Sequence, residues 1–245
     1  MNMFTTFRAL GPIDTRSVRR DSLLRWILLL PLVIALASRW LLPLLITQAE
    51  ALLALPLRVY YPPIMSYALI ALVPFMVGMV IGFLLLDQRD DRTLLALQVT
   101  PLSLNNYLFY RLALPMFISL IVTVVTIPIS GLVHMNLGQL LLAALVAAPQ
   151  APLVALVLAA IAQNKVQGFA LTKASGVVML PPIIAYFIHS PWQIAIGIVP
   201  TYWPAKVLWA LQAGTPVWGY LLGGMVYQLL LLLWLARRFN RVMTR

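Results

Sequence analysis

Five ionised residues lie within six positions of a chain that is otherwise poor in charge. They are Asp87, Arg89, Asp90, Asp91 and Arg92, and they include three of the six acidic residues in the chain. Carboxylates beside guanidinium groups can form ion pairs, either with one another or with a protein partner. Ionised groups are excluded from hydrocarbon, so the cluster must lie in water. It is either an inert patch that ends a membrane segment or a contact site for another molecule.

A short apolar segment follows this cluster. Residues 93–102 read TLLALQVTPL, and a helix here would place Leu94 and Leu95 on a broad apolar face and Thr93 on the opposite one. The segment meets Pro101 and is too short to cross a hydrocarbon core of about 30 Å. It is therefore either a helix at the membrane surface or a docking surface for another protein.

Six uncharged polar side chains stand out within the apolar runs. Four fall on one helical stripe and two are amides deep in their runs: Ser119, Thr123, Thr126, Ser130, Gln150 and Gln228. Small polar residues in membrane helices usually serve close helix contact, and lining a translocation path is the second interpretation. The segment AAPQAP at 147–152 predicts a kink in which the amide satisfies backbone groups that the prolines leave free.

The sequence offers little for other kinds of chemistry. The chain has no cysteine, and its two histidines fall at the ends of apolar runs. We expect no catalytic, metal or cofactor site, because the His, Asp, Glu and Ser residues show no catalytic or ligand spacing. No Asp, Glu, Arg or His falls at the centre of an apolar run, which argues against an ion-coupled transporter.

The elements that carry these residues belong in a membrane. Hydrophobic residues make up 62% of the chain and charged residues 9%, and the mean hydropathy is +0.96, whereas soluble domains carry about 25% charged residues. The net charge is +11. Its Lys and Arg residues lie mostly between apolar runs, which is typical of anchoring at a lipid bilayer and not of nucleic-acid binding.

Six apolar runs have the roughly 20 residues that a transmembrane helix needs. They cover residues 26–47, 64–86, 112–133, 139–161, 168–188 and 217–236. The fifth run is the weakest, because Lys173 lies inside it and Pro181 and Pro182 interrupt it; we expect Lys173 to extend toward the headgroups. We therefore expect an all-α polytopic membrane protein with six transmembrane helices in a single domain over 1–245.

Two glycine pairs predict close helix contacts. Gly78 with Gly82, in the second run, and Gly219 with Gly223, in the sixth, have G-x-x-x-G spacing. This spacing lets two membrane helices approach through their backbones.

The basic residues between the runs predict the orientation. With the N-terminus inside the cell, fourteen of the seventeen Lys and Arg residues fall on cytoplasmic segments, and only Arg39, Arg58 and Lys206 fall outside. Loops rich in Lys and Arg remain in the cytoplasm. We expect both termini in the cytoplasm and a multi-pass protein of the cell (inner or cytoplasmic) membrane.

The charged region, the six runs and this orientation together resemble the type-2 ATP-binding-cassette (ABC) exporter permeases. Their loop after the second span reads roughly acidic-x-x-acidic-x-Gly-Thr-Leu, an apolar stretch, then Thr-Pro or Ser-Pro; this chain has DQRDDRTLLALQVTPLS over 87–103, with Arg92 in place of glycine. Residues 1–25 resemble the family's interfacial connecting helix and its basic entry into the first span. Residues 189–216, rich in Trp, Tyr and Pro, resemble its pair of short re-entrant helices on the outer side between spans five and six.

The resemblance implies the permease subunit of an exporter for amphiphilic or drug-like substrates. In this family the coupling loop, here 87–111, packs against a separate ATPase subunit, and two permeases, identical or different, form the path. The residues implied in coupling are Asp87, Arg89, Asp90, Asp91, Arg92, Thr93, Leu94, Leu95 and Pro101. The sequence contains no G-x-x-x-x-G-K-[ST], so we expect the partner subunit to bind ATP and this chain to be no enzyme. An ion-coupled secondary transporter is the alternative.

Overall fold

The computed structural model describes the backbone of residues 3–90 and 104–243, and side chains within 6–89 and 106–239. All regular elements in this part of the chain are helices. Six helical stretches are long and apolar enough to cross a membrane: Ser22–Leu53, Leu57–Arg89, Asn106–Ser130, Leu137–Ile161, Lys165–Phe187 and Trp218–Phe239. Each overlaps one of the six runs expected from hydropathy, so the prediction of an all-α, six-span membrane protein is confirmed.

The spans are of two kinds. Four are single long helices: α2 (Ser22–Leu53), α3 (Leu57–Asp90), α5 (Leu104–Ser130) and α11 (Trp218–Met243). The fourth and fifth spans are interrupted and consist of α6 (Leu137–Ala147) with α7 (Gln150–Ile161), and of α8 (Lys165–Ser175), the 3-10 segment η1 (Gly176–Met179) and α9 (Leu180–Phe187). The interruption at Pro149 lies within AAPQAP, where the sequence predicts a kink.

Three elements lie outside the long spans. Helix α1 (Met3–Arg20) precedes the first span and packs on α2, α5 and α3, in the place of the expected connecting helix. Between spans five and six lie the 3-10 helix η2 (Pro191–Ile198) and α10 (Tyr202–Ala213). These two short helices occupy the region expected to be re-entrant. Most of one side of α10 is buried, which an ordinary surface loop would not show.

Helices α3 and α7 form the centre of the bundle. Helix α3 contacts α2, α5 and α7, and α7 also contacts α11. The central pair approach closely because of two glycines: a Cβ atom on Gly78 would lie 2.4 Å from the carbonyl oxygen of Ala151, and one on Gly82 would lie 2.8 Å from Leu158. The G-x-x-x-G pair of the second span therefore serves helix packing, as its spacing predicts.

The second glycine pair behaves differently. A Cβ atom on Gly219 would meet no described atom within 4 Å, whereas Gly223 lies against the indole ring of Trp203. A Cβ atom on the next residue, Gly224, would lie 2.6 Å from Trp203 Cβ. Within the chain, the small residues of α11 thus make room for one side chain of α10, and Gly219 takes no part in this contact.

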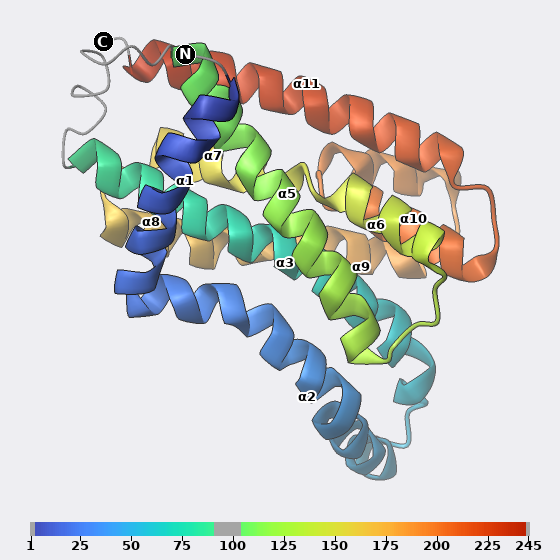
Figure 1. Cartoon of the computed structure of the whole chain (residues 1–245). Coiled ribbons are helices and arrows are strands. Elements are labelled where there is room, and N and C mark those ends of the chain that lie inside the picture. The colour runs from blue at the N-terminus through green and yellow to red at the C-terminus, as the bar shows by residue number, and fades with distance from the viewer. Residues whose placement is uncertain (1–2, 91–103, 244–245) are drawn as a thin grey trace.

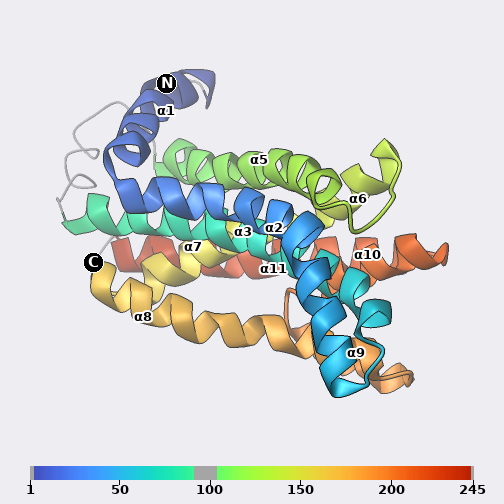
Figure 2. The ribbon, with the colours of Figure 1, turned by 90° about the horizontal axis from the view of Figure 1, so that it is seen from below.

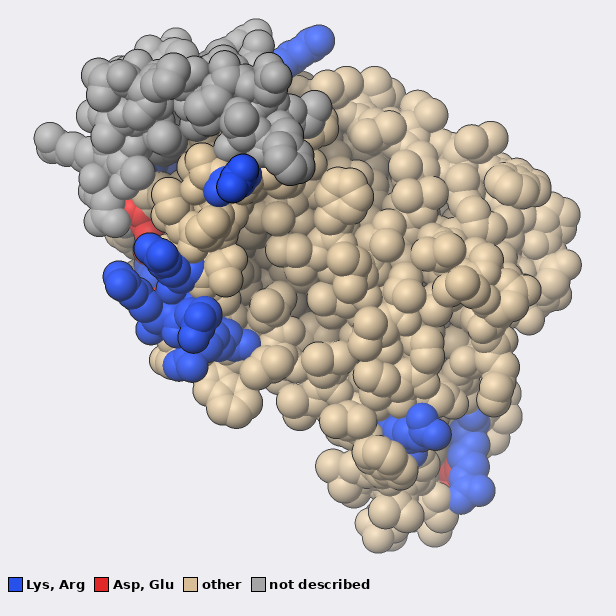
Figure 3. Space-filling view, viewed as in Figure 1, with Lys and Arg blue, Asp and Glu red and all other residues tan. Residues whose placement is uncertain are grey.

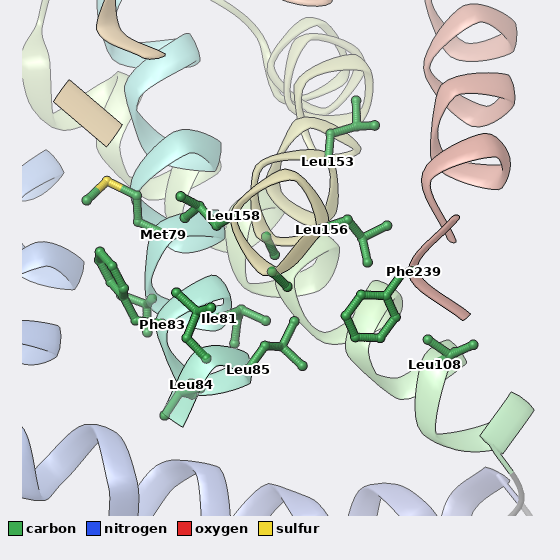
Figure 4. Close-up of a cluster of buried hydrophobic side chains, with 14 of the residues drawn as sticks. Met79, Ile81, Phe83, Leu84, Leu85, Leu108, Leu153, Leu156, Leu158 and Phe239 are labelled. Atoms are coloured by element: carbon green, nitrogen blue, oxygen red, sulfur yellow. The ribbon is translucent and has the colours of Figure 1, made fainter. Parts of the chain in front are cut away.

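An apolar core fills the half of the bundle nearest α1. Figure 4 shows leucine side chains of α3 and α7 gathered with Leu108 of α5 and Phe239 of α11. Burying a side chain of this size contributes about 1.5–3 kcal/mol when it leaves water, but in a membrane much of the gain comes from close packing instead. This core fixes the ends of α3 and α5 relative to each other.

The outer surface of the bundle is apolar and its ends are charged. Figure 3 shows Lys and Arg gathered at the end where α1 lies, a second small group where α2 joins α3, and an uncharged surface between them. Trp26, Leu44 and Phe117 are among the large apolar side chains that are more than half exposed. Figures 1 and 2 both place the end of α11 at the same end of the bundle as α1.

Candidate functional site

Several helix ends meet at one charged end of the bundle, which we call the basic end. It is formed by α1, the last turn of α3, the first turns of α5, and the connection between α7 and α8 (Figure 1). The last described residue of α3, Asp90, and the first of α5, Leu104, both lie at this end. The side chains here determine how these helices are tied together.

A buried ion pair joins α1 to α5. Arg111 donates from Nη1 to Asp14 Oδ2 at 2.8 Å and from Nη2 to Asp14 Oδ1 at 3.2 Å. The Tyr110 hydroxyl donates to the same Asp14 Oδ2 at 2.7 Å. Asp14 and Arg111 are only 5% and 2% exposed. A charge this deep is strongly destabilising when it is left unpaired, so the ion pair fixes how α1 lies against α5.

The same guanidinium group reaches α3. Arg111 Nη2 also donates to Gln88 Oε1 at 2.8 Å, and the Tyr107 hydroxyl donates to that oxygen at 3.0 Å. Gln88 lies in the last turn of α3 and Tyr107 in the first turn of α5. One network, which we call the Arg111 network (Asp14, Gln88, Tyr107, Tyr110 and Arg111), therefore ties α1 to both ends of the segment 91–103.

A second group of charges lies beside it. Lys165, the first residue of α8, donates from Nζ to Asp87 Oδ2 at 2.9 Å and to Asp21 Oδ2 at 3.1 Å. Asp21 caps α2 by accepting hydrogen bonds from the backbone amides of Leu23 and Leu24. Partial burial raises the pKa of Asp21, but hydrogen bonds from Lys165 and these amides outweigh it, so the pKa lies below its ordinary value. The charges link α2, α3 and α8.

Arg89 braces a third helix end. It donates from Nη1 to the carbonyl oxygen of Ala159 at 3.2 Å and from Nη2 to that of Ala162 at 2.7 Å. These carbonyls belong to the end of α7, where backbone acceptors have no partner within the helix. A cation at this place also interacts favourably with the negative end of the helix dipole. Arg89 thus holds the end of α3 against the end of α7.

The structure describes only part of the expected coupling set. Asp87 and Arg89 both bond within the chain, to Lys165 and to α7 respectively. Asp90 is the last residue of α3, and its side chain lies outside the described ones. The rest of the set lies outside the described residues: Asp91, Arg92, Thr93, Leu94, Leu95 and Pro101. Contact of this set with an ATPase stays a prediction.

The stripe of hydroxyl side chains lies on the buried side of α5. Ser119, Thr123, Thr126 and Ser130 are at most 1% exposed. The Ser130 hydroxyl donates to the carbonyl oxygen of Ile127 at 2.7 Å, while the other three hydroxyls have no partner among the described residues. Such burial fits close helix contact, and a role in a translocation path stays a prediction.

The two deep amides both form hydrogen bonds near the interruption between α6 and α7. Gln150 Nε2 donates to the carbonyl oxygen of Pro200 at 3.1 Å, and Gln228 Nε2 donates to that of Val146 at 2.9 Å. The structure therefore brings Gln150 and Gln228 to one place in the bundle. Val146 lies just before the interruption, so Gln228 satisfies a backbone carbonyl there. Gln150, for which the sequence predicts this role, bonds instead to the turn between η2 and α10.

Sequence reasoning missed the Arg111 network and Lys165. From the sequence, Arg111 and Lys165 are expected only to contribute positive charge on the cytoplasmic side. Their ion pairs and hydrogen bonds are not predicted. The signal available was Asp14, an acidic residue among five arginines within residues 1–25. An acidic residue in so basic a segment suggests an ion pair, but the neighbouring sequence does not identify the cation that it binds.

Comparisons with known proteins give one consistent result. A family model described as "Fluoroquinolones export permease protein Rv2686c-like" matches residues 14–236. Two curated relatives from Mycobacterium tuberculosis, fluoroquinolones export permease proteins Rv2686c (strain H37Rv) and MT2760 (strain CDC 1551), are each 35% identical over 234 residues. The match covers 95% of this chain and 93% of each relative. No solved structure matches the chain.

Proposed function

Since the chain belongs to the Rv2686c-like family of fluoroquinolone export permeases, which are type-2 ABC permeases, we propose that a separate ATPase drives it through the basic end. As a multi-pass protein of the cell membrane, it supplies the membrane-spanning part of an ABC exporter. Its place in this family leaves no support for the alternative of an ion-coupled secondary transporter.

The Arg111 network is the observation that carries the proposal. Arg111 bonds to Asp14 of α1 and to Gln88 of α3 from its own position on α5. A force applied to residues 91–103 would therefore reach α1, α3 and α5 together, since one guanidinium group links all three. Tightly packed helices respond to such a force by shifting between discrete packings, which is how the inward-facing and outward-facing states would exchange.

The partners follow from the same reasoning. The sequence has no P-loop motif, so ATP would be bound and hydrolysed by the separate subunit and not by this chain. Two permeases, either two copies of this chain or one copy with a different permease, would complete the path. Asp90, Asp91 and Leu95 are the residues through which we expect the ATPase to bind.

The proposed cargo is an amphiphilic, drug-like molecule. The curated relatives are named for fluoroquinolone export. In this chain, the uncharged outer surface between the ends (Figure 3) and the apolar interior suit a substrate that enters from the lipid phase.

The test compares substitutions at the basic end with a control substitution at the opposite end of the molecule. Asp90→Asn with Asp91→Asn, and separately Leu95→Ser, should lower ATPase copurification and substrate-stimulated ATP hydrolysis at least tenfold, because loss of a desolvated charge pair costs about 2–5 kcal/mol. The matched control is Arg58→Gln, which breaks a partly exposed ion pair with Glu50 at the opposite end. If the loop variants and the control all retain full copurification and hydrolysis, the proposal is wrong.

A further inference from the structure

The fourth and fifth spans are both interrupted about halfway along their length. In the span Leu137–Ile161 the interruption lies between α6 and α7, and in Lys165–Phe187 it is the 3-10 segment η1. Irregular backbone at this depth leaves polar groups without helical partners. It persists in a membrane only where it is buried in protein or lines a cavity.

A third irregular segment reaches the same place. Pro200 and Thr201 form the turn between η2 and α10, and Gln150 Nε2 donates to the carbonyl oxygen of Pro200 at 3.1 Å. The Thr201 hydroxyl donates to the carbonyl oxygen of Val178 in η1 at 2.9 Å. The tip of the re-entrant pair is thus bonded to both interruptions, so three irregular segments meet in mid-membrane.

A cavity of about 240 Å³ opens at this junction. Its walls come from α3, α7, α8, η1 and α11, and include Phe75, Val157 and Leu231. Among the described residues that line it, four are polar and none is ionisable: Gln150, Thr172, Ser175 and Thr201. A dry cavity of about 150 Å³ holds one benzene molecule, so this volume suits a fused two-ring aromatic group.

The polar atoms of the cavity suit a ligand that is uncharged and donates a hydrogen bond. The hydroxyls of Thr172, Ser175 and Thr201 already donate to the backbone carbonyls of Phe169, Leu171 and Val178. The amide nitrogen of Gln150 donates to Pro200, which leaves Oε1 as the atom of this amide that can accept a hydrogen bond.

The remaining polar capacity of the cavity is therefore to accept hydrogen bonds. A full charge buried here would lack a counter-ion.

We propose that this junction cavity binds the uncharged aromatic part of the exported molecule, with Gln150 Oε1 accepting a hydrogen bond from it. The inference rests on the proposed export function and assigns the cargo's place within one protomer. In secondary transporters, substrate sites form where interrupted helices meet near the middle of the membrane, and interrupted helices meet in the same way here. Mostly apolar walls with a few placed polar atoms are the usual composition of a small-molecule site.

The first test uses Ser175→Cys, which places a single thiol in the cavity wall of a cysteine-free chain. The full chain is reconstituted in lipid vesicles, together with any ATPase that copurifies, and the rate of modification by methyl methanethiosulfonate is measured. Indole, a neutral two-ring donor, should slow modification at least tenfold. Indene has the same shape without the N–H group and should protect less, and the cation N-methylquinolinium should not protect. Equal protection by indole and the cation, or no protection by indole, overturns the inference.

The second test fills the cavity. Val157→Trp, added to Ser175→Cys, should abolish protection by indole and stop drug export, while Val226→Trp on the exposed side of α11 should change neither. Retained export by the filled variant contradicts the inference. A modification rate that follows the acyl chain length of the vesicles, and not indole, identifies a lipid tail as the occupant and also contradicts it.

The two proposals fail separately. ATPase copurification depends on the basic end and not on the cavity, so its loss in the loop variants bears only on the coupling proposal. If the complex forms and exports normally while indole leaves Ser175→Cys unprotected, only the cavity inference is wrong. If the ATPase never copurifies while indole protects, the proposed function is wrong and the cavity stands as a binding site.

Discussion

A buried guanidinium group holds three helices together at the basic end. Arg111 loses its hydration there, and its bonds to Asp14 and Gln88 are the compensation that the described residues provide. Its Nε atom has no partner among them, so the two carboxylate oxygens of Asp14 carry most of that compensation. An unpaired charge at this depth is strongly destabilising, whereas removal of both charges is far less so.

This asymmetry predicts a non-additive pair of substitutions. Asp14→Asn or Arg111→Gln alone should destabilise the purified protein by about 3–5 kcal/mol, because each leaves a buried charge unpaired. The double variant should be more stable than the sum of the two effects implies. Thermal unfolding of all four proteins in one detergent measures the interaction, and strictly additive effects would show that the two residues do not form a pair.

Arg89 gives a second prediction at this scale. Its two nitrogen atoms reach carbonyl oxygens of Ala159 and Ala162, a fork that a lysine ammonium group cannot reproduce. Arg89→Lys should therefore lower the unfolding free energy by about 1–3 kcal/mol, since hydrogen bonds to charged groups contribute on this order. Arg92→Lys is the matched comparison in the adjacent loop. Equal stability of Arg89→Lys and the unsubstituted protein would exclude the bracing role of Arg89.

At the scale of elements, the contact between α3 and α7 depends on glycine residues, which have no side chain to keep the helices apart. Gly78→Ala would bring a methyl group to 2.4 Å from the carbonyl oxygen of Ala151, so the two central helices must separate. We expect a loss of about 1–3 kcal/mol, the usual effect of overpacking. Gly219→Ala is the control, because nothing lies within 4 Å of its Cβ position and alanine favours helix by about 0.5–1 kcal/mol. Similar melting temperatures for the two variants would contradict the packing.

The elements differ in how far the sequence alone predicts them. The long helices follow from the length of their apolar runs, and the interruption of the fourth span follows from Pro149, which are local properties. The G-x-x-x-G spacing of Gly78 likewise predicts its close contact with another helix. By contrast, Asp14 and Arg111 are 97 positions apart, and no local pattern says that they meet. The junction cavity likewise depends on three segments whose meeting is set by packing, so sequence reasoning places Gln150 but not its partner Pro200.

At the scale of the whole molecule, the orientation is the main prediction. The sequence assigns fourteen of the seventeen Lys and Arg residues to the cytoplasmic side, together with both termini. Single cysteines at Gln163, between α7 and α8, and at Ala213, at the end of α10, occupy exposed positions at opposite ends of the chain's spans. An impermeant thiol reagent applied to intact cells should label the cysteine at 213 and not the one at 163. Labelling at 163 and not at 213 would show that the predicted orientation is wrong.

The separation between Asp14 and Arg111 also has a consequence for how the protein is made. A ribosome adds about 5–20 residues per second, so the 97 positions between the two residues correspond to roughly 5–20 s of synthesis at that rate. During this interval the first two spans can enter the bilayer while α1 has no guanidinium group to bind. The N-terminal helix therefore docks only once the third span has begun to emerge, and translation that stalls before Arg111 leaves a nascent chain with an undocked N-terminus open to proteases.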